Sequence, residues 1–154
     1  MKTIVIGCDN AGVEFKKTIL SILEGKGIAY EDVGVAQASD TTAYADIAAC
    51  VAHKILESGN TKQGILICGT GIGMAITANK FPGIYAAVCH DIFSAERARL
   101  SNDCNVITMG ARIIAPQLAA KILEEWLSLE FIPGPSSEKI QRVKEYEKQN
   151  FLTI

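Results

Sequence analysis

The chain has 154 residues, of which 49% are hydrophobic, so it can form one domain with a packed core and is not a disordered chain. Its formal net charge of -2 and its lack of a basic run exclude the electrostatic signature of a nucleic-acid-binding protein. No apolar stretch reaches the roughly 18 residues that span a bilayer, and the N-terminus lacks a signal-peptide layout, so we expect a cytoplasmic protein with no membrane partner.

Short apolar strands alternate with amphipathic helices along the chain. In chain order, the pattern predicts a strand at 2–7, a helix at 11–27, a strand at 28–34, a helix at 43–59, a strand at 63–69, a helix at 71–80, a strand at 84–89, a helix at 94–102, a strand at 105–110, and helices at 115–131 and 138–150. Continuous apolar strands that alternate with helices are typical of a parallel sheet covered on both faces.

The sequence therefore predicts an α/β fold in a single domain over residues 1–154. We expect a three-layer, doubly wound, Rossmann-like arrangement with a five-stranded parallel sheet in the order 2-1-3-4-5. An extra helix follows at the C-terminus. Its weak apolar stripe of Ile140, Val143 and Tyr146 predicts packing across a partner subunit.

Five cysteines are present, at positions 8, 50, 68, 89 and 104. No two have C-x-x-C spacing, and the histidines, His53 and His90, lie far apart in the sequence. The odd count indicates free thiols, and the spacing is not that of a structural zinc site. We expect no metal.

The predicted topology selects one edge of the sheet for chemistry. In a doubly wound sheet, ligands bind beyond the carboxyl ends of the strands where the strand order reverses, here between the first and third strands. The first strand ends in "GCDNAG" and the third in "ICGTGIG". This topology brings Asp9 and Asn10 close to Cys68 and Thr70.

Three glycines at alternate positions, Gly69, Gly71 and Gly73, follow the third strand. They let the backbone turn sharply and approach a ligand, and their N–H groups can face one concavity at a helix start. The alternative is a tight turn without a ligand. The segment is not a P-loop, since no Gly-Lys-Ser/Thr follows, and it lacks the dinucleotide fingerprint, which would follow the first strand.

Cys68 stands at the mouth of this turn. The start of a helix lowers the pKa of a thiol, so a thiolate could act there as a nucleophile or as a general base. No histidine is nearby in the sequence to assist a nucleophile, whereas a base needs only an acidic C–H and donors for the oxygen that gains charge. The alternative is a buried residue at a strand end.

Over nearly its whole length the sequence resembles the ribose-5-phosphate isomerase B family, which includes galactose-6-phosphate isomerase subunits. "GILICGTGIGMAITANKFPGI" matches the family's central block almost without gaps. "GCDNAG" is similar to its opening Asp-His-Ala-Gly segment, and "CHDIFSAERARLSND" and "ITMGARII" match its later blocks. The resemblance implies a cofactor-free aldose–ketose isomerase of a phosphorylated sugar.

By this resemblance, Cys68 is the catalytic base that moves a proton between C1 and C2, and Thr70 assists at the substrate oxygens. Asp9 would bind sugar hydroxyls. The backbone amides of residues 69–73, among them Gly69, Gly71, Ile72 and Gly73, would hold the enediolate.

The resemblance also implies binding residues outside the turn: Tyr44, Asn102, Arg112 and Arg142. Tyr44 corresponds to a substrate-contacting tyrosine, although Ala45 replaces the usual proline after it. The arginines correspond to phosphate ligands, and each of them, Arg142 more readily because the segment before it is rearranged, could instead form a surface ion pair. Where the family often has Gly-Gly-Arg-His, this chain reads "IPGPSSEK", so one usual phosphate contact is missing from the pattern.

Two family histidines are replaced. Asn10, expected to bind substrate, follows the first aspartate, and Ser101 stands where the family has the histidine assigned to opening a furanose ring. Serine is a poor proton shuttle near neutral pH. Either His90 or water takes over, or the substrate needs no ring opening; His90 could also be a solvated loop residue. A tetrose 4-phosphate cannot close the usual furanose, because its O4 is esterified. "SAERARLSN" with "ITMGAR" also resembles the branch that acts on erythrulose 4-phosphate.

The prediction is thus an isomerase of the ribose 5-phosphate/ribulose 5-phosphate type. Alternatives are a tetrose phosphate or a hexose 6-phosphate as substrate, a non-catalytic sugar-phosphate-binding protein, and one half of a hetero-oligomeric galactose-6-phosphate isomerase. The resemblance further implies a homodimer or a tetramer of paired dimers, with the active site at the subunit interface and Asn102 reaching the other subunit.

Overall fold

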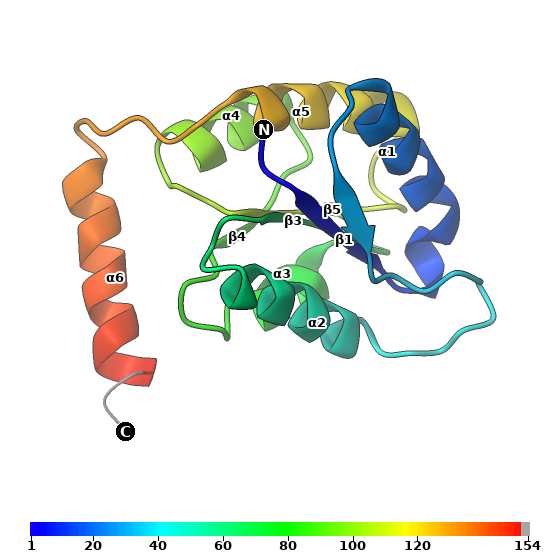
Figure 1. Cartoon of the computed structure of the whole chain (residues 1–154), viewed down its shortest axis with the longest axis horizontal. Helices are drawn as coiled ribbons and strands as arrows, with labels where there is room; N and C mark the ends of the chain where they lie inside the picture. The colour runs from blue at the N-terminus through cyan, green and yellow to red at the C-terminus, as the bar shows by residue number, and fades with distance from the viewer. Residues whose placement is uncertain (152–154) are drawn as a thin grey trace.

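A computed structural model describes residues 1–151 (Figure 1). Its elements are β1 (Ile4–Cys8), the 3-10 turn η1 (Asn10–Gly12), α1 (Val13–Gly25), β2 (Tyr30–Asp32), α2 (Tyr44–Glu57), β3 (Gln63–Cys68), α3 (Ile72–Ala78), β4 (Ala86–Val88), α4 (Ile92–Leu100), β5 (Val106–Gly110), α5 (Pro116–Ser128) and α6 (Ser137–Phe151). Each predicted strand and helix is present. Residues 152–154 of the predicted domain lie outside the described residues.

The strands form one parallel sheet between two layers of helices. Figure 1 shows α1, α4 and α5 on one face of the sheet and α2 and α3 on the other. β1, β3 and β5 are buried along their whole length, because helices cover both of their faces. The predicted three-layer α/β class is confirmed.

The predicted strand order is wrong at one end of the sheet. The observed order is β2-β1-β3-β5-β4, so β5 pairs with β3 and β4 forms the edge. The physical reason lies in the two strands themselves. β5 is buried throughout, which suits an inner position, whereas β4 is short and its side chains are only partly buried, which suits an edge.

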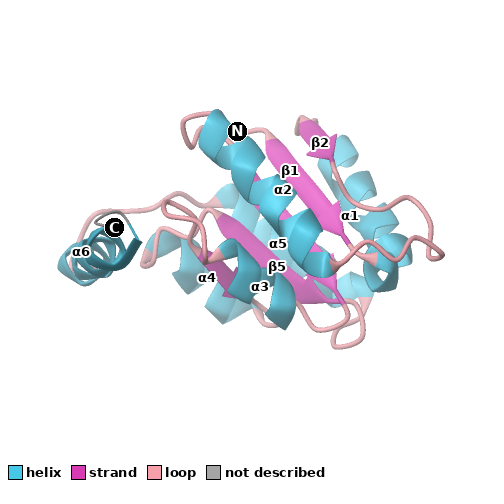
Figure 2. Ribbon diagram, turned by 90° about the horizontal axis from the view of Figure 1, so that it is seen from below, coloured by secondary structure: helices cyan, strands magenta, loops and turns pink. Residues whose placement is uncertain are grey.

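The C-terminal helix α6 stands apart from the three layers, as Figures 1 and 2 both show. Ile140 is its buried residue, while Val143 and Tyr146 of the predicted stripe are about half exposed. The Glu147 carboxylate ties the helix to the chain by accepting hydrogen bonds from the Tyr85 hydroxyl at 2.7 Å and the Gly83 N–H at 2.9 Å. Packing of the stripe against a partner subunit stays a prediction.

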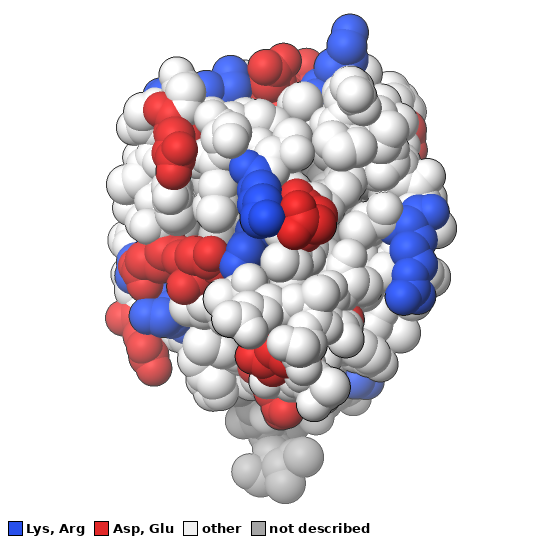
Figure 3. Space-filling model, turned by 90° about the vertical axis from the view of Figure 1, so that its right-hand side faces the viewer, with Lys and Arg blue, Asp and Glu red and all other residues white. Residues whose placement is uncertain are grey.

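Charges of both signs are mixed on the surface of the chain. The face in Figure 3 has acidic and basic side chains next to one another rather than a continuous basic stripe. Among the described residues, no helix is long and apolar enough to cross a membrane.

Candidate active site

A hollow lies beyond the carboxyl ends of β1 and β3. Its lining residues are Asp9, Asn10, Ala11, Tyr44, Cys68, Gly69, Thr70, Ile72, Gly73, Ile76 and Arg112. The two strand ends coincide because Cys8 pairs with Ile67 in the parallel register. The expectation that this edge brings Asp9 and Asn10 together with Cys68 and Thr70 is confirmed.

Cys68 is the last residue of β3 and is 5% exposed. Its Sγ accepts a hydrogen bond from the Gly71 N–H at 3.1 Å. Cys8, at the end of the neighbouring strand, has the opposite environment: its thiol donates to the Val35 carbonyl at 3.6 Å, and burial raises its pKa to about 11. The two strand-end thiols therefore differ: the sulfur of Cys68 accepts a backbone N–H inside the hollow, whereas the thiol of Cys8 donates to a backbone carbonyl.

The three glycines of the turn serve three different contacts. Gly71 has φ +78°, a conformation that L residues with a side chain rarely adopt, and a Cβ there would lie 2.9 Å from the Met109 backbone. A Cβ on Gly73 would lie 2.4 Å from the Tyr44 ring, and one on Gly69 would lie 3.1 Å from the Arg112 guanidinium. Gly69 and Gly73 therefore make room for side chains that line the hollow. The sequence pattern predicts instead that these glycines allow a ligand to approach the backbone.

The turn is held in place from β5. The buried Thr108 hydroxyl donates a hydrogen bond to the Gly71 carbonyl at 2.8 Å. Sequence reasoning missed Thr108, although a hydroxyl within the apolar stretch "NVITMG" is a signal that could have been used, since buried polar groups need partners. Ala11 and Ile76 also line the hollow and were not predicted.

The amides of the turn are partly engaged. The Gly71 N–H is directed at Cys68 Sγ, and the Ile72 N–H donates to Thr70 Oγ1 at 3.3 Å. Both contacts organise the thiol and the hydroxyl that the sequence assigned to chemistry. Asp9 is organised similarly, because its Oδ1 accepts from the Ala11 N–H at 3.0 Å.

The hollow gathers most of the predicted site residues and leaves four outside. Gly71 is not among the lining residues. His90 follows β4, Asn102 lines another hollow beside α4, and Arg142 lies on α6. The Arg142 guanidinium is exposed and pairs with the Glu145 carboxylate at 2.6 Å. The roles of all these residues stay predictions.

His90 accepts a hydrogen bond from the backbone of β5. Because β5 lies between β4 and β3, this histidine is one strand further from Cys68 than the predicted order implied. Its Nε2 accepts a hydrogen bond from the Gly110 N–H at 2.9 Å, so the ring proton is on Nδ1. Burial lowers the pKa of His90, with the Asp91 charge acting in the opposite direction.

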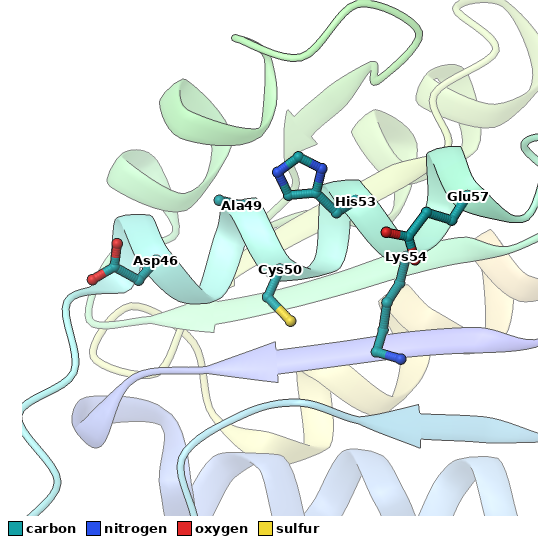
Figure 4. A pocket seen from close by; sticks show the side chains of 6 residues that line it. All are labelled: Asp46, Ala49, Cys50, His53, Lys54 and Glu57. Carbon is teal, nitrogen blue, oxygen red and sulfur yellow. The ribbon is translucent and has the colours of Figure 1, made fainter.

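A second hollow runs along α2, and it does not form a convergent site. Its lining residues are Asp46, Ala49, Cys50, His53, Lys54 and Glu57, all from this one helix. Figure 4 shows His53 and Lys54 pointing away from one another. The His53 ring instead contacts the Phe81 ring edge-on, with centroids 5.1 Å apart. Within residues 1–151, no cluster of His, Cys, Asp and Glu side chains could hold a metal ion.

Comparisons with known proteins agree on one family. The model of the Ribose/Galactose Isomerase family matches residues 4–145. The D-erythrulose-4-phosphate isomerase of Pectobacterium atrosepticum is 46% identical over 149 residues, covering 97% of both chains. The Ribose-5-P isomerase B of Listeria innocua is 46% identical over 147 residues, covering 96% of this chain and 98% of that one.

A solved structure gives the same result. Ribose-5-phosphate isomerase B of Mycoplasma genitalium, with bound ribulose-5-phosphate, superimposes with a TM-score of 0.91 at 32% identity, covering 96% of this chain and 97% of that one.

Proposed function

The chain belongs to the ribose/galactose isomerase family and is a sugar-phosphate isomerase, and we propose that it interconverts an aldose and a ketose tetrose 4-phosphate with the Cys68 thiolate as base. The arrangement of Cys68 supports the assignment of the base. Cys68 lines the hollow together with Thr70, and its sulfur accepts an amide hydrogen bond. Isomerase names among the relatives argue against the non-catalytic alternative.

The reaction needs one group that carries a proton between two carbons. The Cys68 thiolate takes the proton from the carbon next to the carbonyl and becomes a thiol, while the electron pair moves onto the carbonyl oxygen as a cis-enediolate forms. The Thr70 hydroxyl and amides of the glycine turn stabilise this oxygen. The thiol then gives its proton to the neighbouring carbon, which carried the carbonyl. The hydroxyl proton of the deprotonated carbon passes to the first oxygen, so a hydroxyl forms there and the new carbonyl forms at the deprotonated carbon. The electrons stay within the sugar, so no external oxidant or reductant takes part.

The environment of His90 carries the choice of a tetrose. Opening a furanose ring requires a group that moves a proton between the ring oxygen and the anomeric hydroxyl. Ser101 is a poor shuttle, and the acceptor nitrogen of His90 is already used by the Gly110 N–H. A tetrose 4-phosphate avoids this step, because its O4 carries the phosphate and cannot close the usual ring.

Ribose 5-phosphate is the second candidate. Two of the similar proteins favour it, since the Listeria innocua relative is named a Ribose-5-P isomerase B and the Mycoplasma genitalium structure holds ribulose-5-phosphate. With ribose 5-phosphate as substrate, a water molecule would take the part of the missing ring-opening histidine.

We further propose that the working unit is a homodimer, or a pair of such dimers, in the cytoplasm. Tyr44, Ile72 and Ile76 expose 45%, 54% and 59% of their surfaces around the hollow, and exposed apolar side chains around a site mark an interface. A second copy that covers this rim could bring Asn102 and Arg142 to the hollow, from which both are absent within one chain.

Steady-state kinetics test the proposal. The values of kcat/KM are measured side by side on erythrose 4-phosphate, ribose 5-phosphate and allose 6-phosphate, with sedimentation of the same protein. We expect a dimer or tetramer with a clear preference for the tetrose. A preference for ribose 5-phosphate would overturn the substrate and keep the reaction, whereas a fully active monomer would overturn the shared site.

A further inference from the structure

Arg97 lies on the outward side of α4, in its last turn. Two arginines occupy this turn and differ in burial. The Arg99 side chain is 4% exposed, and its NH1 donates to the Cys104 carbonyl at 2.7 Å, so it holds the core together. The Arg97 side chain is 43% exposed and contacts surface groups.

The guanidinium of Arg97 is oriented by two neighbours. Its Nε and NH2 groups face one Glu96 carboxylate oxygen at 3.0 and 2.9 Å, and its NH1 donates to the Ser101 hydroxyl at 3.1 Å. These contacts use only part of the N–H groups of an arginine, so donors remain for a further anion. Ser101 therefore positions a cation where the resembling family carries a histidine.

Arg97 borders two hollows at the edge of the sheet. One lies beside β4 and is lined by Ala86, Ala87, Val88, Cys89, Ser94, Arg97, Ala98, Asn102 and Cys104. Within residues 1–151, Arg97 is the charged side chain in that lining, and Asn102 lines the same hollow. The other is formed with Ser101 and residues 132–136, the segment in which the resemblance leaves a phosphate contact missing.

We propose that Arg97 is a phosphate ligand, supplied to the active site of the partner subunit together with Asn102. This inference rests on the proposed function, in which Asn102 crosses the dimer interface. Arg97 would reach the same site as Asn102, because its guanidinium is hydrogen-bonded to Ser101, the residue before Asn102 in the chain. A guanidinium suits a phosphate dianion, since it can donate two parallel hydrogen bonds to its oxygens.

Kinetics on single variants test the ligand. Arg97→Leu should raise the KM for erythrose 4-phosphate and the inhibition constant of inorganic phosphate by about 10- to 100-fold, with a smaller change in kcat. Arg97→Lys keeps the charge and loses the fork, so its values should be intermediate. Lys121→Leu, which removes an exposed cation of α5 outside these hollows, is the matched control and should leave both constants unchanged.

One result with Arg97→Leu would contradict a phosphate-binding role. An Arg97→Leu protein that keeps its dimeric state, with parental KM and parental inhibition by phosphate, would reduce Arg97 to a surface ion pair with Glu96. Circular dichroism and sedimentation of each variant separate loss of a ligand from loss of the fold or the dimer.

Mixed dimers test whether Arg97 acts across the interface. Arg97→Leu and Cys68→Ala chains are mixed in equal amounts, unfolded and refolded. If Arg97 serves the partner's site, each mixed dimer has one site with both residues intact, and activity at low substrate should reach about a quarter of the parental value. If it serves its own site, the mixture should show only about half of the low activity of Arg97→Leu alone.

The controls separate this inference from the proposed function. A parental enzyme without turnover on any sugar phosphate would refute the function itself. Normal parental turnover, with the low mixed-dimer value, would leave the function standing and refute the crossing of Arg97.

Discussion

The glycine turn and the C-terminal half of the candidate site are built in different ways. The turn between β3 and α3 is fixed within one chain by the Thr108 hydroxyl, the Gly71 amide and close contacts at each glycine. Asn102 and Arg142 instead lie on exposed surfaces away from the hollow, and Arg142 is occupied by Glu145. Groups that transfer a proton must be held rigidly, whereas some of the groups that bind a substrate can come from a second copy of the chain.

The largest effect is expected at the thiol of the turn. Cys68→Ala should lower kcat by at least about 1,000-fold while the fold stays intact, because the group proposed to remove and return the proton is lost. Exchange of solvent deuterium into the sugar, followed by NMR, should fall in parallel. Cys50→Ala removes a partly exposed thiol on α2 and should retain parental turnover. Near-parental activity of Cys68→Ala would remove the assignment of the base.

The next effect concerns the stability of the turn. Gly71→Ala should lower the free energy of unfolding by about 2–4 kcal/mol, since it combines a positive φ with a Cβ pressed against the Met109 backbone. Gly25→Ala, at the end of α1, meets nothing within 4 Å and should be neutral or stabilising by up to about 1 kcal/mol. Urea unfolding of both variants measures the difference; equal stabilities would contradict a rigid turn.

Asn102→Ala should show the reverse pattern. We expect kcat/KM to fall by about tenfold, because a substrate contact is lost, and the free energy of unfolding to change by less than about 0.5 kcal/mol at this exposed position. The control is Asn150→Ala on α6, also exposed, which should change neither quantity. If Asn102→Ala lowered stability and left kcat/KM intact, Asn102 would be structural and the contrast between the two regions would fail.

The smallest effect is the contribution of His90 to the pH dependence of the free energy of unfolding. Since burial lowers its folded pKa, it favours folding above its unfolded pKa of about 6.5, and this contribution is lost as the pH falls from there through the folded pKa. His90→Asn removes this titration. Urea unfolding at about pH 7.5 and about pH 5 should therefore show a smaller acid loss in the variant than in the parent. An identical loss would mean that His90 is equally protonated in the folded and unfolded states.

The sequence by itself determined the elements and the centre of the site. Periodicity predicted each helix and strand, and the position of Cys68 before three glycines indicated the thiol and the edge of the sheet where the candidate site lies. These features are local: they depend on the spacing of apolar residues and on the backbone freedom of glycine, which a chain carries with it before it folds.

The sequence pattern also predicted that the ends of β1 and β3 meet, but only the tertiary structure decided the order of β4 and β5 and the side-chain contacts that depend on it. Because β5 and not β4 pairs with β3, Gly110 lies beside Cys68, and the Gly110 amide donates a hydrogen bond to His90. The Tyr44 ring, which belongs to α2, lies next to Gly73. Arg142 was likewise predicted as a ligand by its resemblance, yet it lies on α6, outside the hollow of its own chain. Such contacts depend on burial and strand pairing between distant segments, and a local pattern holds no information about these.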